Sequence, residues 1–429
     1  MKIAFYTLGC KVNQYETQSI AELFKKNGDI IVENDATPDV FIINSCTVTA
    51  ESDRKTRQML RRFRNMYPLA VLVLCGCMPQ AFPKDAECLA EADIIVGNTT
   101  PSKIPQLVDE FLKNGERIID INEHGRKEKF NTPKIKEFEG RTRAFMKIED
   151  GCDRFCTYCI IPKARGFIRS KSVDEIKKEA ENLAANGYKE IVLVGINLSS
   201  FGKDSGENLA DAVSAVCSVS GITRVRLGSL EPDLMDDQLL KRLSNEEKFC
   251  PQFHLSLQSG SDKTLKRMNR RYDSAFYYDL VSRIRKIFKN PSITTDIMVG
   301  FAGETDEEFL ESLAFVEKVG FALSHVFAYS RREGTVAAGL PYQVTKAEKS
   351  LRSRKMIELT QKSQTVFYRA QIGTTANVLF ETVEENEYLG YTENYTPVKV
   401  KSDKDLCGQT QKVKIIGSKK EFCVGELCE

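Results

Sequence analysis

Three absences narrow the classes of protein to which this chain can belong. No apolar run approaches the roughly 20 residues that a membrane helix needs, and the N-terminus lacks the charged start and apolar core of a secretory signal. Only three histidines occur in 429 residues, which argues against a histidine-rich zinc site. The formal net charge is only +2, so contact with nucleic acid would have to come from local patches. We expect a cytoplasmic protein without a membrane partner.

Cysteine, by contrast, is abundant. The chain has 13 cysteines, and its 41% apolar and 28% charged residues are typical of a soluble globular protein with two or three domains. Without a secretory signal a disulfide framework is not expected. In a reducing compartment, clustered cysteines more often bind metal or perform chemistry.

The most informative stretch is a CxxxCxxC motif within residues 150–166. Cys152, Cys156 and Cys159 stand four and three residues apart. Three thiolates this close can hold three corners of a [4Fe–4S] cube and leave the fourth iron open to a small molecule. This is the arrangement of a radical S-adenosylmethionine (SAM) enzyme. The alternative, a zinc knuckle, usually needs four ligands in paired CxxC form, and no suitable fourth ligand is nearby.

The order of apolar runs predicts an α/β protein of three domains. Residues 1–115 alternate strands with helices and predict a parallel α/β domain. Residues 116–142 are polar and predict a linker, and the six βα units of 143–369 predict a partial (β/α) barrel. Residues 370–429 predict a small antiparallel β-barrel of the kind that binds nucleic acid. In the first two domains we predict strands at 2–8, 40–44, 71–74, 94–96, 144–148, 191–194, 224–227, 252–257, 294–299 and 325–328.

A second set of cysteines follows the predicted strands of the first domain. Cys10, Cys46 and Cys77 each come just past the end of one such strand, and the neighbours Gly9, Ser45 and Gly76 are small or turn-forming. The carboxyl ends of parallel strands line the ligand crevice of an open α/β sheet. These thiols therefore either converge on a second three-cysteine iron–sulfur site or are inert, buried cysteines. Their placement alone favours neither interpretation.

Further stretches give the chain a resemblance to a known family. They are residues 7–14 (TLGCKVNQ), 44–48 (NSCTV), 76–80 (GCMPQ), 255–260 (LSLQSG), 268–271 (MNRR) and 330–335 (SRREGT). With the CxxxCxxC loop, they make the chain similar to the bacterial methylthiotransferase family of radical SAM enzymes, nearly end to end. The last sixty residues are similar to a TRAM domain, a small RNA-binding β-barrel. The chain departs from the family pattern at Asn197, where a histidine is expected, and at Ala302, where a proline is usual.

The resemblance implies an activity and a set of cofactors. It implies two [4Fe–4S] clusters, the radical SAM cluster on Cys152, Cys156 and Cys159 and an auxiliary cluster, which carries the sulfur, on Cys10, Cys46 and Cys77. It assigns Gly195 and Gln258 to the SAM site, and Tyr158 either packs on the SAM adenine or is a core aromatic.

The same resemblance implies a substrate and partners. Residues 10–15 and 151–156 are most similar to the branch that converts N6-threonylcarbamoyladenosine at position 37 of tRNA to its 2-methylthio derivative. A radical derived from SAM would remove the C2 hydrogen, and the auxiliary cluster would supply the methylthio group. The alternative substrates are isopentenyladenosine in tRNA and an aspartate of a ribosomal protein. If the chain is not an enzyme, the alternative is a non-catalytic RNA-binding protein with structural zinc. Implied partners are the tRNA anticodon stem-loop, an electron donor such as flavodoxin or ferredoxin, and a sulfur donor.

Charge indicates where RNA would bind. Residues 54–64 hold six basic and no acidic residues, and residues 345–369 hold seven basic against two acidic. Residues 371–429 hold seven lysines against ten acids, so the C-terminal barrel cannot attract phosphates by net charge. We therefore predict phosphate contacts on the helices at 50–66 and 345–369, although a basic run can also be a merely solvated helix face. The candidates on the first helix are Arg54, Lys55, Arg57, Arg61 and Arg62.

Overall fold

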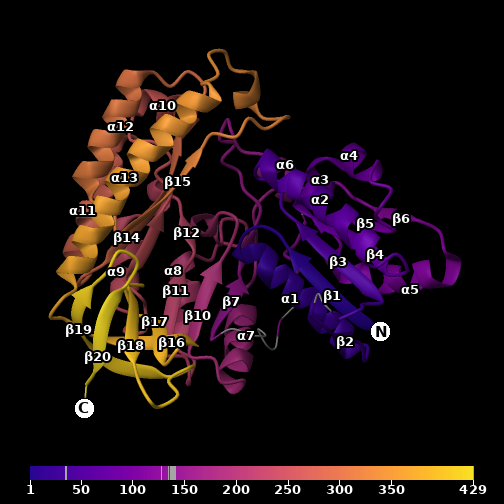
Figure 1. Ribbon diagram of the computed structural model, residues 1–429, viewed down its shortest axis with the longest axis horizontal. Coiled ribbons are helices and arrows are strands. Elements are labelled where there is room, and N and C mark those ends of the chain that lie inside the picture. Colours follow the sequence, from indigo (N-terminus) through magenta and orange to yellow (C-terminus); the bar gives the residue numbers. More distant parts are fainter. Residues whose placement is uncertain (34–35, 127, 134, 136–141, 429) are drawn as a thin grey trace.

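The computed structural model describes residues 1–33, 36–126, 128–133, 135 and 142–428. Figure 1 shows an N-terminal α/β unit, a central group of strands covered by helices, and a small barrel at one end of the central strands. The expected fold class is confirmed. Residues 127, 134 and 136–141 of the predicted linker lie outside the described chain. No helix among the described residues has the length and apolar character needed to cross a bilayer.

The N-terminal unit is a doubly covered parallel sheet with strand order β2-β1-β3-β4-β5-β6. The strands are β1 Lys2–Thr7, β2 Ile30–Ile31, β3 Val40–Ser45, β4 Val71–Gly76, β5 Ile94–Val96 and β6 Ile118–Asp120. One face packs on α2 (Ala50–Met66), and the other packs on α1 (Lys11–Lys26) and α5 (Ile104–Asn114). Short helices α3 (Cys77–Ala81) and α4 (Pro83–Glu87) follow β4.

Two strands of this sheet were not predicted. β2 and β6 are edge strands of two and three residues, too short to give a periodic apolar signal. β6 falls in the predicted linker, so the sheet continues beyond the boundary that we set at residue 115.

The central unit is an open barrel of parallel strands with helices on its outside (Figure 1). One sheet has the order β11-β10-β7 and the other β12-β13-β14-β15, and a bridge from Val225 to Phe249 joins them. The strands are β7 Arg143–Lys147, β10 Glu190–Val194, β11 Arg224–Leu227, β12 Ser229–Leu230, β13 Gln252–Leu255, β14 Ser292–Val299 and β15 Leu323–Ala328. The long helices are α7 Val173–Ala185, α8 Leu209–Cys217, α9 Asp237–Ser244, α11 Ser274–Ile287, α12 Asp306–Val319 and α13 Lys346–Ala370. A two-stranded ribbon of β8 (Glu149–Asp150) and β9 (Arg169–Ser170) and the short helices α6 (Ile161–Arg165) and α10 (Asp262–Arg267) complete the unit.

The C-terminal unit is a closed five-stranded barrel with strand order β16-β17-β18-β20-β19. Its strands are β16 Thr375–Glu384, β17 Glu387–Tyr391, β18 Pro397–Lys401, β19 Thr410–Ser418 and β20 Cys423–Leu427. The expectation of a purely antiparallel barrel is wrong at one seam, because β18 and β20 pair in parallel. β19 returns to pair with β16, and β20 runs antiparallel to β19, so β20 must run in the direction of β18.

Arginines in the central strands fasten the C-terminal barrel to the amino-terminal end of the open barrel. Arg143 of β7 pairs with Glu381 of β16 at 2.5 Å. Arg224 donates to the carbonyl oxygen of Tyr391 at 2.9 Å. Arg226 donates to Glu190 at 2.9 Å and also to a backbone carbonyl after β17. These contacts place the C-terminal barrel against the amino-terminal ends of the central strands.

Candidate metal centre

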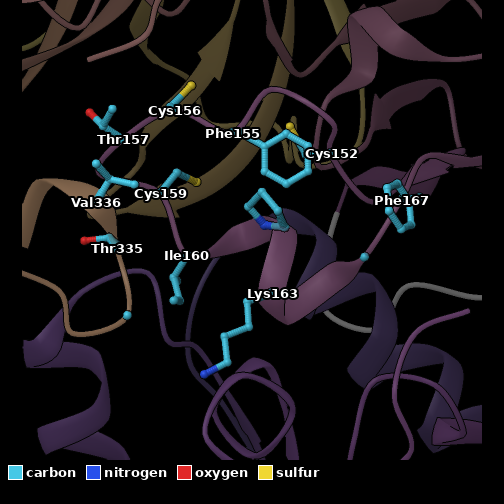
Figure 2. Close-up of a pocket in the computed structure, with 13 residues that line it drawn as sticks. Cys152, Phe155, Cys156, Thr157, Cys159, Ile160, Lys163, Phe167, Thr335 and Val336 are labelled. Carbon is cyan, nitrogen blue, oxygen red and sulfur yellow. The ribbon is translucent and has the colours of Figure 1, made fainter. Parts of the chain in front are cut away.

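The CxxxCxxC motif lies in the loop between β8 and α6. Cys152, Cys156 and Cys159 all line one cavity of about 350 Å³. Figure 2 shows the three cysteines on a single stretch of loop, with Phe155 beside them. Thr335 and Val336, from the segment after β15, form another wall. The local spacing in the sequence thus puts three thiols around one space.

Backbone hydrogen bonds from two distant segments hold this loop. The Thr157 N–H donates to the Met268 carbonyl at 3.1 Å, and the Ala337 N–H donates to the Thr157 carbonyl at 2.8 Å. The Asn269 amide donates to the Phe155 carbonyl at 3.0 Å. Phe155 itself has φ +50°, a left-handed conformation that is rare for an aromatic residue. Such strain persists only where the surroundings enforce it, commonly at functional sites.

A guanidinium group contacts one thiol of this loop. Arg270 Nη1 lies 3.3 Å from Cys156 Sγ, and Arg270 Nη2 pairs with Glu231 at 2.6 Å. Burial raises the pKa of Cys159 to about 12, and the nearby Arg270 opposes that rise. Metal binding needs thiolates. The positive charge of Arg270 favours that ionised form.

Three buried oxygen atoms at the carboxyl ends of barrel strands have no hydrogen-bond partner in the described chain. They are Glu149 Oε1, Asn197 Oδ1 and Gln258 Oε1. Buried polar atoms are seldom unsatisfied, and a ligand is one ordinary reason. The amino and hydroxyl groups of SAM are suitable donors, so the residues present fit this cofactor. Asn197, where the family pattern has histidine, also has its Nδ2 atom 3.7 Å from Cys152 Sγ.

The predicted SAM residues occupy different surroundings. Gln258 has φ +67° and is one of the three residues with an unpartnered oxygen. Gly195 lies so close to Glu149 that an added Cβ would be 2.5 Å from its Oε2. The Tyr158 ring meets Phe301 edge-on at 6.3 Å and packs in an apolar cluster, a position that suits a core aromatic. All three assignments to SAM stay predictions.

Cys10, Cys46 and Cys77 follow three neighbouring strands of the N-terminal sheet. Cys10 precedes α1 after β1, Cys46 follows β3 directly, and Cys77 begins α3 after β4. Because β1, β3 and β4 are adjacent and parallel, these carboxyl ends meet at one edge. Cys46 and Cys77 are buried, and Cys10 is exposed. Burial raises the pKa of Cys77 to about 12, and the neighbouring Arg165 opposes the rise.

Arg165 joins the two cysteine-bearing regions. It is fully buried at the end of α6, and its Nε and Nη2 atoms lie 3.3 and 3.2 Å from Cys77 Sγ. Cys77 also packs in an apolar cluster with Ile160, the residue after Cys159. The two sets of cysteines thus lie on segments in direct contact. They do not line the same cavity, however, because Cys10 borders a second cavity of about 520 Å³ inside the central barrel.

In the described chain, no group of three or more His, Cys, Asp or Glu side chains could hold one metal ion. A cube carries its thiolates at separate corners and spaces them further apart than the ligands of one ion. Each set also has a guanidinium group within hydrogen-bonding distance of one sulfur, which suits an anionic cluster.

The backbone before Cys77 admits only glycine, which gives a testable prediction. Gly76 has φ +99°, and an added Cβ would lie 2.6 Å from the Ser45 carbonyl oxygen. We expect Gly76→Ala to move Cys77, to lose iron from the N-terminal set, and to lower the free energy of unfolding by more than about 1 kcal/mol. Iron assay and urea denaturation test this. Gly28→Ala is the matched control, because Gly28 has φ +88° with nothing within 4 Å. Equal effects of the two substitutions would contradict the prediction.

Acidic neighbours neutralise most of the predicted RNA-binding run on α2. Arg54 pairs with Glu51 at 2.5 Å, Arg57 with Asp85 at 3.5 Å, and Arg61 with Glu91 at 3.0 Å. Lys55 and Arg62 are exposed, and within the described chain they form no ion pair. On α13, Arg352 is buried against Glu304. The exposed cations of α13 are Lys346, Arg354, Lys355, Lys362 and Arg369.

Sequence reasoning missed the charged residues that organise the site. Arg165 and Arg270 lie in stretches that attracted attention for cysteines or for family resemblance, and nothing in their spacing indicates that they are buried. The only available signal was their proximity in sequence to the motifs. A charged residue can be recognised as buried only when the residues that surround it in the tertiary structure are known.

Family models and similar proteins agree with this geometry. The model "Radical SAM superfamily" matches residues 146–316, and "Uncharacterized protein family UPF0004" matches residues 2–97. The chain is 37% identical over 421 residues to "Threonylcarbamoyladenosine tRNA methylthiotransferase MtaB" of Bacillus subtilis, covering 96% of this chain and 93% of that one. It is 38% identical to the protein of the same name in Aquifex aeolicus, covering 95% and 98%.

A second group of relatives has another name. The chain is 34% identical to "tRNA-2-methylthio-N(6)-dimethylallyladenosine synthase" of Thermoanaerobacter sp., covering 99% of this chain and 92% of that one. Among solved structures, the radical SAM methyltransferase TsrM of Kitasatospora setae aligns with a TM-score of 0.57 at 12% identity, covering 76% and 74%. That likeness shows the fold alone.

Proposed function

The chain belongs to the methylthiotransferase family of radical SAM enzymes, and from this premise we propose that it converts N6-threonylcarbamoyladenosine at position 37 of tRNA to the 2-methylthio derivative. The relatives named for this substrate are 37% and 38% identical, against 34% for the relative named for dimethylallyladenosine. The reaction replaces the C2–H bond of adenine with a C2–S bond.

The observation that carries the proposal is the contact of Arg165 with Cys77. It brings the segment after the CxxxCxxC loop against the strand ends that bear the other three cysteines. A methylthiotransferase needs both centres near one base, whereas a simpler radical SAM enzyme needs one. We therefore assign Cys152, Cys156 and Cys159 to the radical SAM cluster, and Cys10, Cys46 and Cys77 to an auxiliary cluster.

The C2–H bond of adenine is neither acidic nor electrophilic at neutral pH. Acid–base catalysis contributes only about 10²–10⁴-fold, so the difficult step needs cofactors. When bound, the two clusters supply the electron that cleaves SAM and the sulfur that is transferred. The chain's own residues bind and orient these groups. Arg270 and Arg165 hold positive charge at Cys156 and Cys77, and the three unpartnered oxygens offer acceptors to SAM.

The reaction also requires partners. Cleavage of SAM consumes electrons, so an electron donor such as flavodoxin or ferredoxin is needed, and each methylthio group removes a sulfur atom that a sulfur donor must replace. The target base lies in the anticodon loop. Unpaired loops of RNA can be splayed out for recognition.

Nucleoside analysis tests the proposed function. In tRNA from a deletion strain, mass spectrometry should show loss of 2-methylthio-N6-threonylcarbamoyladenosine and retention of the unmethylthiolated form, and the cloned gene should restore it. Loss of the isopentenyl derivative instead would assign the other tRNA substrate. Unchanged tRNA would refute the proposal and favour a protein substrate.

The unpaired cations of α2 lead to a prediction about RNA binding. Each protein–phosphate contact contributes about 0.7–0.9 to the slope of log K against log salt. If Lys55 and Arg62 contact phosphates, Lys55→Glu with Arg62→Glu should reduce the slope for tRNA binding by about 1.5. Filter binding from low to moderate salt measures it. Arg61→Gln is the control, because Glu91 already pairs with Arg61. An unchanged slope in the double variant would exclude this face of α2.

A further inference from the structure

The second cavity occupies the interior of the central barrel. Alternate residues of a strand face the same side, and here Gln252 and His254 of β13 face the cavity together with Thr294 and Asp296 of β14. Its volume is about 520 Å³, within the usual range for a small-molecule site. Tyr395 of the C-terminal barrel borders the cavity as well. Cys10 and Lys11, at the start of α1, also line the cavity and are neighbours in the chain.

Most charged groups in this cavity already have partners. Arg226 is paired with Glu190 at 2.9 Å. Asp296 Oδ2 lies 3.2 Å from His254 Nε2, and the other ring nitrogen of His254 lies 3.0 Å from Thr294 Oγ1. These pairs leave the polar edges of His254, Thr294 and Asp296 toward the cavity.

Lys11 is the exception. Its Nζ atom lies 5.7 Å from the centre of the Phe145 ring, and in the described chain no carboxylate forms an ion pair with it. Its charged neighbours include Arg143 and Arg226, which repel it, and Glu190, which attracts it without forming an ion pair. The Lys11 side chain is exposed where it borders the cavity. Its ammonium is therefore free to form a charge-assisted pair with an anion that enters the cavity.

We propose that the Lys11 ammonium binds the carboxylate of the N6-threonylcarbamoyl group, so that one residue both selects this tail and sets the adenine beside Cys10. This rests on the proposed function and adds the recognition element to it. The tail carries a carboxylate, a hydroxyl and a urea. The carboxylate matches Lys11, and the hydroxyl and urea match the polar edges of His254 and Asp296. Charge-assisted pairs of this kind are the stronger hydrogen bonds.

The same cavity disfavours a hydrocarbon tail. An isopentenyl group offers no hydrogen-bonding atom, so it would exclude water from Lys11 and Asp296 without replacing it. Sites built for polar groups reject analogues that lack them, because the buried groups of the site are then left unpaired. Lys11 follows Cys10 directly in the chain. A base whose tail reaches Lys11 therefore lies next to the N-terminal cysteines.

Binding of modified stem-loops tests the inference independently of turnover. The ligands are anticodon stem-loop RNAs with N6-threonylcarbamoyladenosine at position 37, its methyl ester, and plain adenosine. Anisotropy is measured anaerobically with the reconstituted holoenzyme. Wild type should bind the free acid at least about tenfold more tightly than the ester, a difference of about 1.4 kcal/mol. Lys11→Met should abolish that preference, and Lys11→Arg should keep part of it.

Controls separate recognition from folding. Lys26→Met, at the other end of α1, should retain the wild-type preference. The iron content and melting temperature of Lys11→Met should match those of wild type. If they do not, Lys11→Gln replaces it as the neutral variant in the binding measurement. The inference would be overturned if wild type bound the acid and the ester equally. It would also be overturned if a neutral variant at position 11 still preferred the acid. The proposed function fails by a different result, namely that wild type forms no methylthio product from the acid stem-loop.

Discussion

Replacing Cys152, Cys156 and Cys159 together by alanine should abolish cleavage of SAM to 5′-deoxyadenosine and lower the iron content of the reconstituted protein from about eight to about four per chain. The reason is that these three thiols are the only side chains of their loop that can hold a cube, and they share one cavity. Without a cluster there, no electron reaches SAM. Iron assay and chromatography of SAM products measure both effects.

The matching variant of the N-terminal set should behave differently. Alanine at Cys10, Cys46 and Cys77 should also remove about four irons, yet SAM cleavage should persist while methylthiolation is lost. Alanine at Cys88, Cys407 and Cys428, none of which is buried, should change neither quantity. Full iron content in the N-terminal variant would refute the second cluster. Bound zinc and no SAM cleavage in wild type would favour the non-catalytic RNA-binding alternative.

The second large effect is expected at Arg165. Replacement by methionine should lower the free energy of unfolding by about 3–5 kcal/mol, because it leaves the buried Glu16 carboxylate without its guanidinium partner. Arg165 pairs with Glu16 of α1 at 2.9 Å and approaches Asp150 to 3.6 Å. Lys147 also contacts both, at 2.6 and 2.7 Å, and Arg169 contacts Asp150 at 3.2 Å, so the loss of Arg165 falls mainly on Glu16. The network spans the contact between the N-terminal and central units, so the loss should loosen that contact.

Urea denaturation of Arg165→Met, followed by circular dichroism, measures this cost. Arg283→Met is the matched control: Arg283 also pairs with two carboxylates, those of Asp237 and Asp279, but they are largely exposed. Exposed pairs contribute about 0–1 kcal/mol, so this variant should change stability little. The iron of the N-terminal set should fall in Arg165→Met, because Cys77 loses its cationic neighbour. Equal stability of the two variants would show that the buried network is not needed.

The elements that were predicted correctly are those whose signal is local. The apolar runs of β3 and β4 are buried throughout, and a continuous apolar run of that length predicts a buried strand. α2 is capped at its N-terminus by Thr49, whose side chain accepts from the Ser52 N–H. A threonine in that place is a start signal that can be recognised in the sequence. The edge strands β2 and β6 were missed because two or three residues carry no period. The parallel pairing of β18 with β20 was missed because the sequence of a strand does not indicate which other strand it pairs with.

The polar interior of the barrel was likewise beyond prediction. His254 and Asp296 alternate with apolar residues along β13 and β14, a pattern equally typical of a strand whose polar side faces solvent. Only closure of the sheet turns that polar side inward. Nothing in the sequence marked Lys11 as a cavity residue, because its place beside the cavity depends on where α1 meets the central barrel.

The sequence by itself determined the family, the radical SAM loop and the cysteines that follow the strands of the first sheet, because covalent spacing and strand order are properties of the chain alone. The tertiary structure decided what each charge meets: Arg165 lies against Cys77, Arg270 lies against Cys156, and Lys11 borders a cavity without a counterion. The physical reason is that the free energy of a charge depends on the atoms that surround it, and those atoms come from segments far apart in the chain.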